Sequence, residues 1–95
     1  MIRHVVFRGL VQGVGFRAFV EDEAARTGIA GFVRNRRDGT VEAVFAGEAK
    51  DVDDTIAACR KGSYASRVDG IEVRDGSAEE LALRGRDRFA VLPTV

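Results

Sequence analysis

Residues 5–17 read VVFRGLVQGVGFR. The segment opens with an apolar run typical of a buried strand, and it leads into an amphipathic stretch that begins at Phe16. The glycines between them, Gly9, Gly13 and Gly15, can take a positive φ that other residues rarely adopt. The pattern therefore predicts a strand that turns tightly into a helix.

A turn of this kind is suited to binding an anion. Glycine-rich backbone can direct several N–H groups toward one point, and the start of a helix adds unpaired N–H groups and the positive end of its dipole. Arg17 follows directly and contributes a permanently charged guanidinium. We therefore predict a cradle for a phosphate-sized oxyanion at residues 12–17.

In the rest of the chain, segments whose apolar residues repeat with the helical period of about 3.6 residues alternate with segments that have the two-residue period of a strand. Phe16, Phe19, Val20 and Ala24 lie on one face of a helix that Gly28 should end. Asp38-Gly39 is typical of a tight hairpin turn. Ser77 and Glu80 have the spacing of a capping box, so residues 76–87 could form either a brief helix or a plain loop. The predicted elements are strand 2–8, helix 16–27, strands 31–37 and 40–46, helix 49–61, strand 68–73 and strand 89–92.

This order is β-α-β-β-α-β with a short extra C-terminal strand. It predicts an α/β, ferredoxin-like sandwich in which two helices pack on one face of an antiparallel sheet. The 95 residues are expected to form a single domain over 1–95.

Composition limits the function classes. The chain is 45% apolar and has no net charge, which favours a folded protein and argues against a general nucleic-acid binder. The one cysteine, Cys59, reads as the buried side of a helix and excludes an internal disulfide and a multi-cysteine metal site. No signal peptide or apolar run of about 18 residues is present, so we expect a cytoplasmic protein without membrane contact.

A second group of polar residues lies in the predicted hairpin. Asn35 falls within a strand, where asparagine is disfavoured, so its amide should serve a bond that the fold or the chemistry requires. An amide offers a donor and an acceptor, which suits holding a water in line with phosphorus, and it does not repel a dianion. Arg34, Arg36 and Arg37 would either add positive field there or, for the last two, lie on a solvated face.

Two other polar residues favour plain structural interpretations. His4, the only histidine, is placed inside the first strand, which favours a structural or surface role. Gln12 is either a substrate contact or a loop residue that bonds local backbone, and the second is favoured.

The two motifs, residues 9–17 (GLVQGVGFR) and residues 31–35 (GFVRN) followed by Gly39, Val41 and Gly47, resemble those of the acylphosphatases. The resemblance covers nearly the whole chain. It implies an enzyme that hydrolyses the carboxyl–phosphate mixed anhydride of acyl phosphates to a carboxylate and inorganic phosphate. It also implies the same ferredoxin-like fold and no metal or organic cofactor.

The resemblance assigns roles to single residues. Arg17 and the loop amides would bind the phosphoryl group, and Asn35 would position the attacking water. The implied phosphate-binding residues are Gly13, Val14, Gly15, Phe16 and Arg17, and the implied catalytic residues are Arg17 and Asn35. The partners would be a small acyl phosphate and inorganic phosphate, with no nucleic acid, and we expect a monomer.

Two other functions are open. A non-catalytic module of the same fold would bind a phosphorylated metabolite or act as an accessory domain. An RNA-binding ferredoxin-like domain would need paired aromatic residues on an exposed sheet face, which no predicted strand shows.

Overall fold

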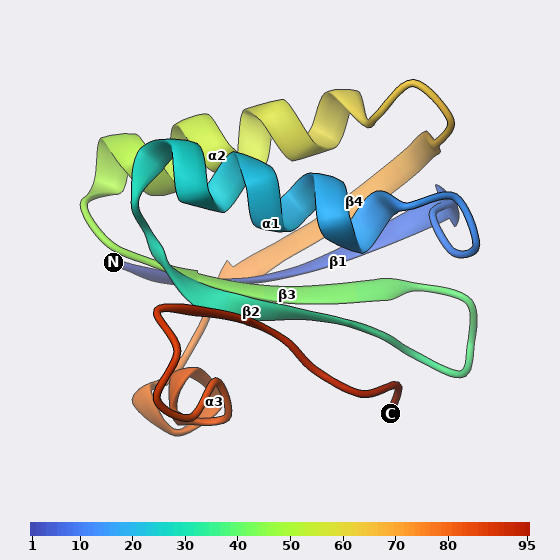
Figure 1. The fold of residues 1–95 in the computed structure, drawn as a ribbon. Helices are drawn as coiled ribbons and strands as arrows, with labels where there is room; N and C mark the ends of the chain where they lie inside the picture. The colour runs from blue at the N-terminus through green and yellow to red at the C-terminus, as the bar shows by residue number, and fades with distance from the viewer.

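Helices α1 and α2 form one layer and a five-stranded sheet forms the other in the computed structural model, which describes all of residues 1–95 (Figure 1). The sheet order is β4-β1-β3-β2-β5. The elements are β1 (Ile2–Leu10), α1 (Phe16–Thr27), β2 (Ala30–Asn35), β3 (Val41–Ala46), α2 (Ala49–Lys61), β4 (Arg67–Asp75), α3 (Ala78–Ala82) and β5 (Phe89–Val91). The predicted ferredoxin-like class is confirmed.

Both long helices have the predicted bounds. Gly28 ends α1 with φ 74°, and its N–H bonds the carbonyls of Ala24 and Ala25. Within α1 the expected core stripe is confirmed, since Phe16, Val20 and Ala24 are buried and Phe19 is partly buried. No helix in the structure is both long and apolar enough to cross a membrane.

The strands differ from prediction at several places, and β4 (Arg67–Asp75) is longer than the predicted 68–73 at both ends. β1 continues to Leu10 because β4 pairs with it that far, Leu10 lying opposite Arg67. The hairpin strands are shorter than expected, so Arg36 lies in a five-residue turn instead of a strand. β5 pairs parallel with β2, because the chain passes through α3 before it reaches the sheet edge; the sheet is therefore mixed and the prediction of a wholly antiparallel sheet was wrong.

The core between helices and sheet fixes the start of α1. Phe16 packs edge-on against Phe7 of β1, with ring centroids 5.1 Å apart. Cys59 of α2 lies in the same core, and its burial raises the pKa of the thiol to about 12, which makes it unreactive. Because β1 and α1 are held together on both sides of it, the glycine loop between them has little freedom of position.

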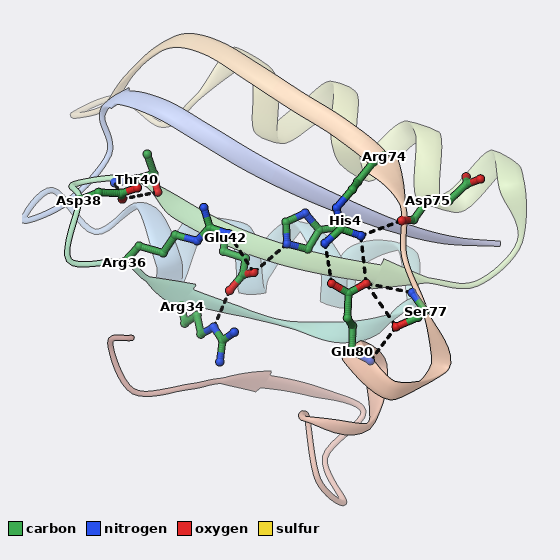
Figure 2. Close-up of polar contacts among 10 residues, drawn as sticks. All are labelled: His4, Arg34, Arg36, Asp38, Thr40, Glu42, Arg74, Asp75, Ser77 and Glu80. Carbon is green, nitrogen blue, oxygen red and sulfur yellow. Dashed lines mark hydrogen bonds and ion pairs between the residues drawn. The ribbon is translucent and has the colours of Figure 1, made fainter.

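The short helix α3 covers part of the opposite sheet face. Ser77 and Glu80 form the capping box, so the helical alternative for residues 76–87 is confirmed at Ala78–Ala82. Arg74 bonds both carboxylate oxygens of Glu80 (Figure 2), and these bonds lower the pKa of Glu80 to about 2. Beneath α3 a second apolar cluster forms around Phe32 and Val44, so β3 is buried on both faces.

Candidate active site

The loop between β1 and α1 has an unusual backbone. Gly13 and Gly15 have φ values of 74° and 79°, and no residue other than glycine has a positive φ in the protein. The N–H groups of residues 12–15 donate no hydrogen bond within the protein, and the first helical bond of α1 is from Phe19 to the carbonyl of Gly15 at 3.1 Å. The loop and the first turn of α1 thus carry a series of unpaired donors.

A cavity of about 330 Å³ opens beside this loop. Its walls come from the loop, the first turns of α1, the end of β2 and β5. The lining residues are Val11, Gly13, Gly15, Phe16, Arg17, Ala18, Glu21, Asn35 and Val91. The structure therefore brings Arg17 and Asn35 together across one cavity, although 17 residues separate them in sequence. Val14, predicted with the loop, packs its side chain against the core instead of lining the cavity.

Asn35 is the last residue of β2. Its side chain points to the helix-covered side of the sheet, and its Oδ1 is buried without a hydrogen-bond partner. A buried, unpaired amide oxygen costs roughly 1–3 kcal/mol, so folding alone does not account for it. Asn35 Oδ1 is the only buried side-chain polar atom in the protein in this state. Since Oδ1 of Asn35 has no partner in the protein, it is suited to accept a hydrogen bond from a water or from a ligand in the cavity.

The guanidinium of Arg17 is also uncommitted. Arg17 is partly buried, lines the cavity and makes no side-chain hydrogen bond, and its charge has no carboxylate partner within 4 Å. Its neighbours in the site are neutral apart from Glu21. A planar fork beside unpaired amides matches the geometry and charge of a phosphoryl group.

Gln12 connects this loop to the hairpin. Its Nε2 donates to the carbonyl of Arg36 and to that of Thr40, both at 2.7 Å. These carbonyls belong to the turn that follows Asn35. The favoured interpretation of Gln12 as a residue that bonds backbone is thus correct, but the backbone is that of a distant turn, which fixes the loop relative to the end of β2.

The hairpin arginines do not join the cavity. Arg34 and Arg36 lie on the opposite face of the sheet, where both pair with Glu42 of β3 (Figure 2). The physical reason is the two-residue period of a strand, which places Arg34 opposite to Asn35. Arg37 is exposed and does not line the cavity. Of the two alternatives, an added positive field at the site is therefore wrong for these three arginines, whereas the favoured solvated position is found for Arg37.

Glu42 holds a buried polar cluster on that second face. His4 Nε2 lies 2.7 Å from its Oε2, and Arg34 Nε donates to its Oε1 at 2.5 Å. Burial raises the pKa of Glu42, but the hydrogen bonds from His4 and Arg34 outweigh burial and bring the pKa below its ordinary value. His4 is thus structural, as favoured from the sequence.

This cluster predicts an acid-sensitive contribution to stability. Since the folded state lowers the pKa of Glu42, its stabilisation is present above about pH 4.5 and is lost as the pH falls through the lowered value. Glu42→Gln should reduce the free energy of unfolding at pH 7 by about 2–3 kcal/mol, less than for a fully buried pair because Arg34 and Arg36 are partly exposed. Urea unfolding of both proteins from pH 3 to pH 7 checks this: the difference should shrink toward pH 3, and a constant difference would contradict it.

Four cavity residues were missed from the sequence: Val11, Ala18, Glu21 and Val91. Glu21 is exposed, yet it also lines the cavity. Its position one helical turn after Arg17 was a usable signal, because residues four apart share a helix face. Val91 could not be found in this way, since it depends on how β5 joins the sheet.

Comparisons with known proteins identify the family of this chain. The family model described as Acylphosphatase matches residues 3–90. A curated acylphosphatase of Nitrobacter hamburgensis is 53% identical over 96 residues, covering 100% of this chain and 97% of that protein. The crystal structure of acylphosphatase from Bacillus subtilis matches with a TM-score of 0.83 and 36% identity, covering 97% of this chain and 99% of that one.

A domain of this kind also occurs inside a longer protein. Full-length HypF, in its phosphate- and nucleotide-bound form, matches with a TM-score of 0.83 and 29% identity over 98% of this chain, but only over 12% of the HypF chain. The matches to the curated acylphosphatases of Nitrobacter hamburgensis and Bradyrhizobium diazoefficiens, in contrast, cover 97% and 96% of those proteins. The chain therefore belongs to the acylphosphatase family of enzymes.

Proposed function

We propose that this protein hydrolyses the mixed anhydride of small acyl phosphates, with the phosphoryl group bound by the loop at residues 12–17 and by Arg17, and with the attacking water positioned by Asn35. The observation that carries this assignment is the shared cavity, where an unpaired guanidinium, unpaired amides and a buried free acceptor converge. Inorganic phosphate, as product, would occupy the same cradle.

The reaction needs mainly the positioning of substrate and water and the stabilisation of negative charge on the phosphoryl oxygens. The leaving group is a carboxylate, which is stable once formed, so neither a covalent nucleophile nor a strong acid is needed. Arg17 and the amides of Gly13 to Arg17 would spread the charge of the phosphoryl oxygens in the transition state. The carbonyl of Asn35 would accept a hydrogen bond from the water and aim it at phosphorus.

No protein base is assigned to the water. The cavity contains no histidine or cysteine, and its one carboxylate, Glu21, lies a helical turn beyond Arg17. We propose that a phosphate oxygen of the substrate takes the proton as the water attacks. We also propose that no metal is used, because no cluster of three or more His, Cys, Asp or Glu side chains could hold one.

Wider properties follow as parts of the same proposal. We propose that residues 1–95 act as a single domain, as a monomer, in the cytoplasm, and without a nucleic-acid partner. The zero net charge and the single, buried thiol support this. Light scattering checks the monomeric state, and cell fractionation checks the cytoplasmic location.

Hydrolysis of benzoyl phosphate in ¹⁸O-labelled water, with EDTA present, tests the reaction and its course together. Attack of water on phosphorus should place the label in inorganic phosphate, which ³¹P NMR resolves from unlabelled phosphate. Label in benzoate instead would mean attack on the carbonyl carbon and would contradict the assigned roles. Loss of turnover in EDTA would contradict the metal-free proposal.

The second candidate function is that of a non-catalytic phosphate-binding module. The match to a small part of HypF favours keeping it, because a domain of this fold is there part of a larger protein. The two functions share the cradle, so phosphate binding does not separate them. Turnover does: binding of phosphate without hydrolysis of any acyl phosphate would favour the module.

Gln12→Ala should lower activity by loosening the position of the loop, although Gln12 is not proposed to contact the substrate. The change removes both hydrogen bonds that tie the loop to the turn after Asn35, each worth about 1 kcal/mol net. We expect kcat/KM to fall by about 10-fold and the free energy of unfolding by about 1–2 kcal/mol. Kinetics with benzoyl phosphate and urea unfolding measure the two; unchanged kinetics in a destabilised variant would show that Gln12 serves the fold alone.

A further inference from the structure

We infer that Glu21 makes the protein select acyl phosphates whose acyl group carries no negative charge. The selection rests on the function proposed above, since the phosphoryl group must occupy the loop end of the cavity. Beyond that end lie Ala18 and Glu21 of α1 and Val91 of β5, and they are the groups left to receive the acyl part of a substrate.

The direction of the acyl group follows from the helix. Glu21 comes four residues after Arg17, so its backbone lies about 6 Å further along the axis of α1 and on the same face. A phosphoryl group held by Arg17 and the loop amides leaves its acyl substituent to extend away from those donors, along α1 toward β5. A substituent of two or three carbons, or a benzene ring, spans that distance.

The walls on this path are apolar except at one point. Ala18 and Val91 offer methyl groups, and Val91 is 43% exposed, so its surface is free for contact. Glu21 is exposed and makes no ion pair or hydrogen bond, and the one cation on the cavity wall, Arg17, lies a helical turn away at the phosphoryl end. An apolar path that ends at a free carboxylate accepts a neutral acyl group and repels an anionic one.

Neighbouring acids do not share this position. Asp22 is exposed and does not line the cavity, while Glu23 pairs with Arg26 at 3.5 Å. Glu21 is thus the only carboxylate on the cavity wall. Glu21 is exposed, so the effective dielectric lies between that of a protein surface and that of bulk water, and at a separation near 5 Å its repulsion of a second carboxylate then corresponds to about 10-fold in kcat/KM.

A series of para-substituted benzoyl phosphates tests the selection. The parent is neutral, the 4-carboxy compound adds a negative charge, and the 4-trimethylammonio compound adds a positive one. The ratio of kcat/KM for each charged compound to that for the parent is compared between the unchanged protein and Glu21→Gln, so that the intrinsic reactivity of each compound cancels. Asp22→Asn is the matched control, since it removes the same charge from an adjacent residue outside the cavity.

In Glu21→Gln the relative rate of the 4-carboxy compound should rise by about 10-fold, and that of the 4-trimethylammonio compound should fall by a similar factor. Asp22→Asn should leave both ratios within about twofold, because its charge is solvated and screened. Ratios that are unchanged in Glu21→Gln would overturn the selection while leaving the proposed function intact. A large loss of kcat for the neutral parent, without a change in the ratios, would place Glu21 in the chemistry and overturn the selection too. Absence of turnover in the unchanged protein would instead overturn the proposed function, and the selection with it.

Discussion

Arg17→Ala should lower kcat/KM for benzoyl phosphate by about 10³-fold or more. The guanidinium is proposed to form two charge-assisted hydrogen bonds to the phosphoryl oxygens, each worth about 1.5–3 kcal/mol, and every 1.4 kcal/mol is a factor of ten. The loss should appear in binding as well as in turnover, because product phosphate carries the same oxygens. Steady-state kinetics, with inorganic phosphate as a competitive inhibitor, measures both effects, and the inhibition constant should rise by about 10²-fold.

Two further variants make the result specific. Arg17→Lys keeps the charge and loses the planar fork, so it should recover only part of the activity. Arg37→Ala removes an exposed arginine that does not line the cavity, and it should leave kcat/KM within about twofold. Equal losses in Arg37→Ala and Arg17→Ala would mean that the overall positive field, and not a phosphate contact, controls the rate.

Asn35→Ala is expected to separate turnover from binding. If the side chain aims the water, kcat should fall by about 10²- to 10³-fold, as when one preorganised polar group is removed from other active sites. The inhibition constant of phosphate should stay within about threefold, since Arg17 and the loop amides remain. Single-turnover and inhibition measurements on the same preparation check the two quantities.

The same substitution should not harm the fold. Oδ1 of Asn35 is buried and unpaired, so its removal relieves a desolvation cost, and the free energy of unfolding should stay constant or rise by up to about 1 kcal/mol. A gain in stability together with a loss of kcat would identify Asn35 as a residue retained for function. A variant that keeps its kcat near that of the unchanged protein would refute the assigned role.

The helices and the site loop were predictable because their signals are local. Glycines at the ends of α1 and α2 and the capping box at Ser77 determine where each helix begins or ends within a few residues. Hydrophobic period two likewise located the hairpin. Arg17 and Asn35 were selected by their local setting and by the resemblance of two short motifs.

What escaped prediction depends on contacts between distant segments. β5 pairs parallel at the sheet edge, and nothing in its three residues states which strand it joins. The same is true of Arg34, whose side of the sheet follows from the register of β2 against β3 and whose partner, Glu42, is buried on that side. The two carbonyls that Gln12 bonds, those of Arg36 and Thr40, lie 24 and 28 residues further along the chain, so no local sequence pattern predicts them.

The alternation along β2 has a consequence for how this protein tolerates change. Successive residues of one strand serve opposite surfaces: Asn35 belongs to the chemistry, whereas Arg34 belongs to the ion-pair cluster around Glu42 on the reverse side. Because adjacent residues of the strand point to opposite faces of the sheet, substitutions on the reverse face do not contact the cavity. Residues on the reverse face can therefore change, by random drift or by redesign for heat or acid resistance, while the groups proposed to bind phosphate keep their positions.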